Sequence, residues 1–494
     1  GRGGGDAYEY PIRPGSAVWK TLQSHDDMVR VTQVEESLLA SMSDEGLVRT
    51  VLSYPLLGDV LAYNSPQQGF DAIRSQFGGL RELLGREGAA ELLLRRYQQT
   101  DAADVPAVLS LEEQGRRTRD LFHVEILLAQ PEILAGMNDE LLDELLLETL
   151  VKREQKLERL EVYGFAGLES TAFTAVRALE RAQPGPATRN KVSQKMNAFL
   201  ETGGPATIEV LDSIFARTEK VVLGSSYRAL SKRSGATSKD YTSTVSTPKG
   251  TAVPVWVMTY ELSSADIAAC NSNAVATYPN ATRLRDCSRM YNCHSYAWHN
   301  QSLPNNVWIN TPGDDKYWQD GSYVSAAITG GQKVSYASDD HSAIAISASV
   351  YESKWGQWPL MRHAPCYTPY DCSVLNGYQL APPPTPGIAV SIQRNNTGGG
   401  DPELIYTPNY SWETSYVDFY NEFDYTSLSG VTFDWRISWD GGAEQPLSSD
   451  PSVTMGFTCL MANHSVELIL TISAPGWQTG SSRKSWNIVG YGCY

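Results

Sequence analysis

Hydrophobic positions in the first 225 residues recur at spacings of three and four, as the buried face of an amphipathic helix requires. The longest such run covers residues 138–163, where Asn138 is expected to cap a helix and Glu148 and Lys152 to form an i,i+4 ion pair. The charged residues that follow are predicted to form a solvated face of this helix: Arg153, Glu154, Lys156, Glu158 and Arg159. The pattern predicts an all-α domain over residues 1–225, with a repeat-like rhythm but no strict period.

Beyond residue 387 the pattern changes to short runs in which apolar and polar residues alternate. Residues 431–437 and 466–472 are examples, and turn residues such as 440–442 separate the runs. About seven short strands in about 107 residues predict an all-β, immunoglobulin-like sandwich over residues 388–494. Such sandwiches carry many functions, so this one indicates none in particular.

Two segments with the composition of linkers divide the chain. Residues 226–250 are rich in Ser, Thr and Gly, and residues 382–387 form a proline-rich stretch that is neither helix nor central strand. Residues 251–381 are therefore predicted to be a separate middle domain. The chain is expected to be multidomain, with three parts in series.

Composition adds the class of protein and its compartment. With 41% hydrophobic and 19% charged residues the 494-residue chain is globular, and its net charge of −16 disfavours nucleic acids and anionic membranes as partners. No apolar run approaches the ~18 residues that span a bilayer. Because the sequence opens at Gly1 without an initiator Met, we expect an upstream segment such as a secretion signal or lipid anchor.

Cysteines and tryptophans gather in the second half of the chain. Trp19 is the only one of the 12 tryptophans before residue 231, and all seven cysteines lie beyond it. Without C-x-x-C spacing a structural zinc site is not expected, and no metal or cofactor is predicted. The cysteines indicate an oxidising compartment, so the protein is expected to be secreted or on the cell surface. Proximity suggests three disulfides, although six cysteines allow 15 connectivities: Cys270–Cys287, Cys366–Cys372 and Cys459–Cys493.

Cys293 is the cysteine that this pairing leaves over, and its surroundings suggest chemistry. A helix starting at or just after Asn292 puts Cys293 in its first turn, where the helix dipole lowers the pKa of a thiol. About 48 residues later, Asp339-Asp340-His341 leads into an apolar strand of small residues, 342–346. A histidine held at the edge of such a strand can face the helix and act as a base.

These two motifs resemble those of the papain-like cysteine amidohydrolases and peptidases of the NlpC and CHAP types. The resemblance covers about residues 250–380 and rests on Tyr291-Asn292-Cys293-His294 and Asp340-His341-Ser342-Ala343-Ile344. It implies an α+β papain-like fold for the middle domain. It also implies that Cys293 is the nucleophile and His341 the base of an enzyme that cuts amide bonds, most often in bacterial cell-wall peptides.

A third polar residue should orient the histidine. Lys354 is donor-only and cannot accept the second imidazole N–H, whereas Glu352 can. Glu352 is therefore favoured, with neutral His363 or a simple dyad as the alternatives. The Cys293 N–H is expected to be one oxyanion donor; Tyr291 or Asn292 is expected to supply the second.

Trp355 is added to Tyr291 and Asn292 as a substrate contact, although a place in the core is favoured for the aromatic residues of this region. His294 and His299 are interpreted as packing or surface residues, and residues 310–318 as an exposed loop.

The sequence thus predicts a secreted cysteine amidase or endopeptidase acting on a peptide or peptidoglycan. The alternatives are a non-catalytic surface or adhesion protein and an acyltransferase using the same pair. The oligomeric state is left open.

Overall fold

The computed structural model forms two compact units, Gly1–Ala381 and Pro382–Tyr494. It describes residues 6–183, 191–223, 240–336, 340–382, 387–395, 404–407, 414–422, 425 and 428–490. The boundary between the units falls where the proline-rich segment begins. Helices fill the start of the chain and antiparallel sheets its later parts, so the coarse order of elements follows the expected one.

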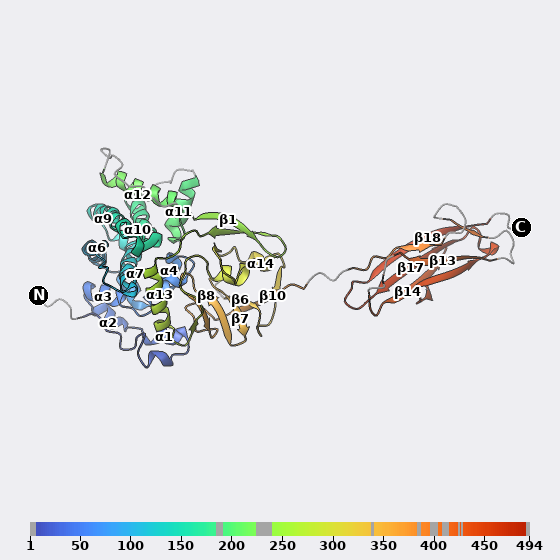
Figure 1. Ribbon diagram of the computed structural model, residues 1–494, viewed down its shortest axis with the longest axis horizontal. Coiled ribbons are helices and arrows are strands. Elements are labelled where there is room, and N and C mark those ends of the chain that lie inside the picture. The colour runs from blue at the N-terminus through green and yellow to red at the C-terminus, as the bar shows by residue number, and fades with distance from the viewer. Residues whose placement is uncertain are drawn as a thin grey trace. The chain divides into compact units, whose positions relative to one another are not determined.

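Helices dominate the first 223 residues (Figure 1). They are η1 (Trp19–Thr21), α1 (His25–Val31), α2 (Glu36–Ser41), α3 (Asp44–Leu52), η2 (Leu57–Ala62), α4 (Pro66–Gln76), α5 (Gly78–Leu84), α6 (Ala89–Gln99), α7 (Leu111–Leu128), α8 (Pro131–Ala135), α9 (Asp139–Glu158), α10 (Leu160–Ala182), α11 (Lys191–Thr202) and α12 (Ile208–Leu223). Asn138 caps α9 as predicted, its side chain accepting from the N–H of Leu141 at 2.9 Å.

The predicted solvated face of α9 is wrong in part. Its glutamates are exposed, whereas Arg153 and Lys156 are buried. The Nζ of Lys156 lies 2.8 Å from both carboxylate oxygens of Glu125 on α7, and it also donates to Thr171 at 2.9 Å. A buried ammonium is tolerated because a carboxylate and a hydroxyl surround it. The sequence pattern of alternating charges cannot reveal that another helix supplies the counter-charge.

The remainder of the first unit is built on two antiparallel sheets. One has the order β1-β2-β4 and the other β3-β9-β8-β7-β6-β10-β5. The strands are β1 (Tyr241–Ser246), β2 (Ala252–Val257), β3 (Thr282–Arg283), β4 (Val307–Trp308), β5 (Tyr323–Ser325), β6 (Lys333–Tyr336), β7 (Ser342–Ser347), β8 (Val350–Lys354), β9 (Leu360–His363) and β10 (Leu375–Leu380). The helices here are α13 (Ser264–Thr277), the π-helical η4 (Ser295–His299) and α14 (Lys316–Gln319).

The helical region and the seven-stranded sheet share one hydrophobic core, so the two domains expected at 1–225 and 251–381 form a single compact unit. Helix α13 lies against α7 (Figure 1). Their backbones approach closely at Gly115, where a Cβ would stand 2.0 Å from the carbonyl oxygen of Ala265. Trp19, fully buried, donates its indole N–H to the carbonyl of Thr277 at 2.7 Å. Separate domains would not bury side chains in each other in this way.

Part of the expected linker 226–250 is a strand. Residues 241–246 form β1, which pairs with β2 from Tyr241 opposite Val257 to Ser246 opposite Ala252. Residues 224–239 lie outside the described part of the chain. Ser and Thr occur both in linkers and in exposed edge strands, so composition alone does not distinguish a linker from a strand here.

The second unit is β-rich (Figure 1). It has a hydrophobic core of its own. Its strands are β11 (Ile392–Arg394), β12 (Leu404–Thr407), β13 (Ser415–Asn421), β14 (Thr432–Trp439), β15 (Gln445–Ser448), β16 (Ser452–Phe457), β17 (Ser465–Ser473) and β18 (Gly480–Gly490), with one 3-10 turn, η5 (Cys459–Met461). They form the sheets β11-β13-β16 and β12-β18-β17-β14-β15, whose buried residues, such as Trp435 and Trp486, alternate along the strands as predicted. Over the described ranges, no helix of the protein combines the length and apolar composition needed to cross a membrane.

Candidate functional site

Cys293 is the one cysteine of the described residues that is not in a disulfide, and its side chain is buried. The pairing prediction is confirmed for two pairs: Cys270–Cys287 and Cys366–Cys372. Cys459 is disulfide-bonded, and its predicted partner Cys493 lies outside the described residues. These bonds fit an oxidising compartment outside the cytosol.

A helix begins at Cys293, as predicted, and continues as η4. Asn292 caps it: its Oδ1 accepts from the backbone N–H of Ser295 at 3.1 Å and from that of Ile309 at 3.2 Å. Its Nδ2 donates to the carbonyl of Ile309 at 2.6 Å. Because a backbone N–H only donates and a carbonyl only accepts, these contacts fix which end of the Asn292 carboxamide is oxygen.

Asn64 lies in the loop between η2 and α4 and reaches this helix from the helical region. Its Oδ1 accepts from the Nδ2 of Asn292 at 2.8 Å and lies 3.9 Å from the Sγ of Cys293, which donates to it. Its Nδ2 donates to the carbonyl of Asp340 at 3.4 Å and lies 3.0 Å from the Nε2 of His294. One side chain therefore joins the cysteine segment to the residue that precedes the predicted base.

His294 is fully buried and is not the packing or surface residue that was expected. Its Nδ1 lies 2.8 Å from the carboxylate of Asp314 and 2.8 Å from the hydroxyl of Ser342, while Thr311 lies 3.3 Å from Nε2. Asp314 and His294 are close enough to form an ion pair, but neither carboxylate oxygen of Asp314 makes a hydrogen bond. The hydrogen bond of Nδ1 is to the hydroxyl of Ser342 instead. Burial lowers the pKa of His294, but Asp314 and the neighbouring Cys293 outweigh it and raise that pKa well above its ordinary value.

The segment that carries Asp314 was expected to be an exposed loop, and this is a second correction. Gly313, Asp314 and Tyr317 are buried. A carboxylate in such a place is stabilised by a nearby imidazole that can hold a proton. The polarity of the segment hid this role, because sequence does not show that a histidine 20 positions earlier lies beside it.

His341 is also fully buried, but its environment is the reverse of that of His294. Both ring nitrogens lack a hydrogen-bond partner. The ring stacks on Tyr370, with centroids 3.6 Å apart and planes 9° apart, and it meets Tyr336 edge-on at 4.8 Å. Burial, helped by the nearby His363 and His294, lowers the pKa of His341 well below its ordinary value, so the ring is neutral at neutral pH.

Cys293 and His341 are not hydrogen-bonded to each other. The ring of Tyr370 stacks on His341. Burial raises the pKa of Tyr370 well above its ordinary value, and the negative charge of Cys293 in its thiolate form is the next cause of that shift. The two predicted motifs therefore meet at Asn64, and neither ring nitrogen of His341 has a hydrogen-bond partner.

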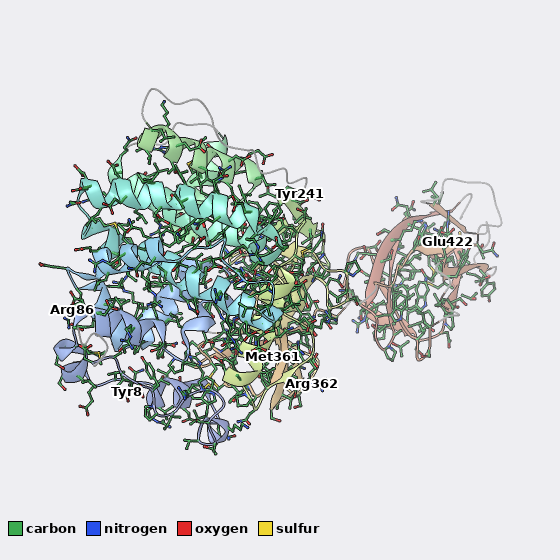
Figure 2. The ribbon with its side chains drawn as sticks, turned by 60° about the vertical axis from the view of Figure 1, so that its left-hand side comes forward. Tyr8, Arg86, Tyr241, Met361, Arg362 and Glu422 are labelled. Atoms are coloured by element: carbon green, nitrogen blue, oxygen red, sulfur yellow. A yellow bond between two sulfur atoms is a disulfide. The ribbon has the colours of Figure 1, made fainter. Side chains whose placement is uncertain are left out.

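Glu352, predicted to orient His341, is engaged elsewhere. It lies opposite Arg362 in the β8–β9 pair and accepts from that guanidinium at 2.6 and 2.9 Å, and from the hydroxyl of Tyr296 at 3.2 Å. Arg362 is labelled in Figure 2. The alternative, His363, bonds Ser353 at 2.7 Å and the carbonyl of the following residue at 2.8 Å. Neither side chain contacts a nitrogen of His341.

All three predicted substrate contacts are buried structural residues. Trp355 is fully buried, packs edge-on against Tyr278 at 4.8 Å and donates to Ser353, so it offers no surface to a substrate. Tyr291 is buried beneath the Nζ of Lys354, 5.2 Å from its ring centre. Asn292, the third, is the cap described above. The core interpretation of the aromatic residues holds for Trp355 and Trp358.

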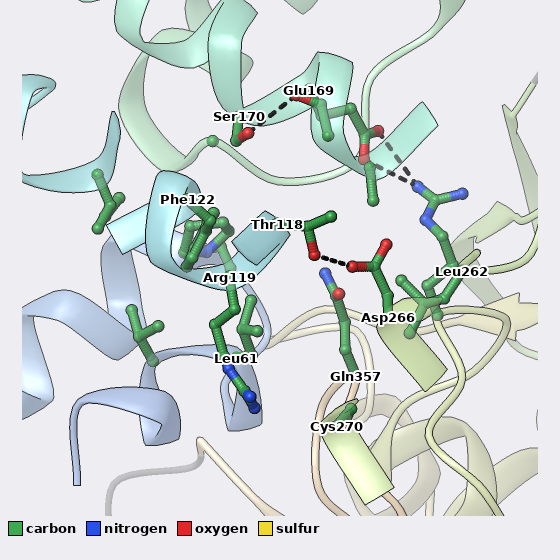
Figure 3. A pocket seen from close by; sticks show the side chains of 18 of the residues that line it. Leu61, Thr118, Arg119, Phe122, Glu169, Ser170, Leu262, Asp266, Cys270 and Gln357 are labelled. Atoms are coloured by element: carbon green, nitrogen blue, oxygen red, sulfur yellow. Dashed lines mark hydrogen bonds and ion pairs between the residues drawn. The ribbon is translucent and has the colours of Figure 1, made fainter. Parts of the chain in front are cut away.

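Two hollows lie near the site. The first, of about 110 Å³, lies between α7, α10 and α13; in its wall Thr118 bonds Asp266, and Glu169 pairs with Arg289 at 3.2 Å (Figure 3). The second is an open groove of about 740 Å³. It is lined mainly by amide, hydroxyl and aromatic side chains, among them Gln68, Phe199, Thr202, Trp256 and Asn310. Asn64 lines both hollows, and only the groove has the size of a usual ligand site.

Sequence reasoning missed Asn64, His294 and Asp314. His294 follows Cys293 directly, and its chemistry could have been noticed as a second imidazole beside the thiol. Asp314 and Asn64 carried no such signal, because each lies in a loop of ordinary turn composition. Across the described ranges, no group of three or more His, Cys, Asp or Glu side chains is placed to hold a metal ion.

Comparison with known proteins adds little. No family model matches the sequence, and no curated protein matches it. Among solved structures, the extracellular domain of a putative hybrid two-component system from B. thetaiotaomicron is similar at 8% identity, over 50% of this chain and 31% of that chain, with a TM-score of 0.14. A likeness this weak carries no argument about fold or function.

Proposed function

We propose that the protein is a secreted cysteine amidohydrolase or endopeptidase that cleaves amide bonds, with Cys293 as nucleophile and His341 as base. The observation that carries the proposal is the position of Asn64. It contacts the thiol of Cys293 and the backbone of Asp340, so two motifs that lie 48 residues apart meet at one point. Bacterial cell-wall peptides are the proposed substrate, on the resemblance described above.

The reaction would proceed by acyl transfer. The sulfur of Cys293 attacks the amide carbonyl carbon while His341 takes the thiol proton. The C–N bond then breaks, and His341 returns that proton to the leaving amine, which leaves a thioester. Water, deprotonated by the same imidazole, attacks the thioester carbon and releases the acid and the thiol. An acyltransferase would use an amine in place of this water.

The state of the two histidines supports the choice of base. A general base needs a nitrogen lone pair that no other group occupies. Neither nitrogen of His341 has a hydrogen-bond partner, so the one lone pair of the neutral ring is free, whereas both nitrogens of His294 already have partners. Stacking on Tyr370 holds the imidazole in place without consuming either nitrogen. Glu352 has no part in the proposal, because Arg362 occupies it.

Burial of the thiol favours a second candidate function, a non-catalytic surface or binding protein. Cys293 is only 1% exposed and lines neither hollow. A thiol with no path to substrate would be a packing residue. The groove beside Asn64 would then bind a peptide without chemistry.

Thiol labelling separates the two functions. Native, non-reduced protein is treated with iodoacetamide across about pH 5 to 9, and labelled peptides are mapped by mass. The enzyme proposal expects Cys293 to react rapidly below about pH 7, and it expects His341→Ala to abolish that early reaction. His299→Ala, which removes an exposed histidine of the same helix, should leave it unchanged. Labelling only near about pH 8.5, as for an ordinary thiol, would overturn the proposal.

Product analysis then defines the reaction. Peptidoglycan fragments incubated with the wild type should release new amines and acids, and Cys293→Ala should release neither. Addition of an acceptor amine distinguishes transfer from hydrolysis, because a transferase joins the acyl group to it.

A further inference from the structure

The orientation of the Asn64 side chain is determined by a chain of contacts that begins at the backbone. Ile309 donates its N–H to Asn292 and accepts from it through its carbonyl, which fixes the Nδ2 of Asn292. That Nδ2 lies 2.8 Å from Asn64, so the atom of Asn64 that faces it must be oxygen. The opposite orientation would place two N–H groups against each other.

The same orientation places a donor against His294. The Nδ2 of Asn64 lies 3.0 Å from the Nε2 of His294, and it also donates to the carbonyl of Asp340. An amide N–H requires a lone pair on its partner, so Nε2 has to be bare in the neutral ring. The proton of the neutral ring is then on Nδ1, where Asp314 and Ser342 lie.

The oxygen end of Asn64 acts on the thiol. It accepts from the S–H of Cys293, with 3.9 Å between sulfur and oxygen. A carbonyl oxygen stabilises a thiol that donates to it and repels a thiolate. One carboxamide therefore accepts from the thiol of Cys293 and donates to the bare Nε2 of His294.

We infer that Asn64 is a positioning residue of this site: its carboxamide fixes the neutral tautomer of His294 with the proton on Nδ1, and it makes Nε2 the nitrogen that gains or loses a proton. The groups that face His294 are Asp314, Cys293 and His341, besides the neutral Ser342 and Thr311. Asp314 favours a second proton on the ring, and Asn64 opposes it. This inference rests on the proposed function only for its effect on catalysis.

The tautomer is measured directly in the wild type. Full-length protein labelled with ¹⁵N in its histidine rings is followed by NMR from about pH 5 to 10, and the His294 signals are identified by their loss in His294→Gln. We expect Nδ1 to stay protonated throughout and Nε2 to titrate. A neutral form protonated on Nε2 would overturn the inference, and this result needs no Asn64 variant to fold.

Asn64→Ala tests whether Asn64 opposes the second proton that Asp314 favours on the ring of His294. Without the amide N–H, the pH at which Nε2 gains its proton should rise by about one unit. A residue with a purely structural role would change the thermal unfolding temperature without moving this midpoint.

Asn306→Ala is the matched control, because Asn306 is exposed and its amide contacts only the carbonyl of Met258. The midpoint of Nε2 should stay at its wild-type value in this variant. An unchanged midpoint in folded Asn64→Ala would overturn the inference. If His341→Ala had no effect on labelling while the Asn64 shifts appeared, the proposed function would fail and the role of Asn64 would stand.

Discussion

The side-chain oxygen of Asn64 lies 3.9 Å from the sulfur of Cys293, across 229 residues of sequence. Asn64 belongs to the helical region and Cys293 to the region that resembles a papain-like enzyme. The helical region therefore contributes a residue to the candidate site and is more than a scaffold or partner-binding module beside it. Three further predictions concern buried charged groups of the first unit.

Asp314→Asn should reduce stability most at low pH. The pKa of His294 is raised in the folded state, chiefly by Asp314 against the effect of burial, so the folded protein binds more protons than the unfolded chain above about pH 6.5. That stabilisation is complete below about pH 6.5 and is lost as pH rises through the folded pKa. The free energy of unfolding of the wild type should exceed that of the variant more at pH 6 than at pH 9, measured by urea denaturation. A difference that grew with pH would contradict this.

Lys354→Met should show the opposite dependence on pH. The Nζ of Lys354 is fully buried and donates to the carbonyls of Ser288, Gly356 and Trp358 at 2.8, 2.6 and 2.6 Å. Loss of these three bonds should cost about 3 kcal/mol or more. Burial lowers the pKa of Lys354 to about 7, so between about pH 7 and 10.5 the unfolded chain binds the extra proton and stability rises with pH.

This rise should be present in the wild type and missing in Lys354→Met, so their difference in unfolding free energy should widen from pH 7 to pH 9. Lys316→Met is a suitable control, since Lys316 bonds one carbonyl, that of Ala252, at an exposed position. An equal effect of both substitutions would argue against a special role for the buried ammonium.

Glu125 and Lys156 form a buried ion pair in the helical region. Removing one partner alone should destabilise the protein more than removing both. Lys156→Met leaves the carboxylate of Glu125 buried without its counter-charge and should destabilise the first unit by about 3–5 kcal/mol. The double variant Glu125→Leu/Lys156→Met should lose much less, because no unpaired charge remains. Denaturation followed by the far-UV helix signal measures both, and equal losses in the single and double variants would refute the argument.

Local signals were sufficient for much of the fold. The helix cap at Asn138, the helix start at Cys293, the alternating strands of the second unit and two disulfide pairs all depend on residues close in sequence or on a strict period. The buried basic residues of α9 and the strand within the expected linker before β2 were missed for one reason. Their burial or pairing depends on partners from other segments.

The candidate site divides in the same way. The sequence by itself determined that Cys293 opens a helix and is left over from pairing, because capping and cysteine spacing are local properties. Only the tertiary structure decided that Asn64 and Asp314 flank the cysteine–histidine segment and that Arg362 occupies Glu352. These contacts join segments whose spacing carries no periodic signal. Tertiary packing, which no local pattern encodes, is what brings them together.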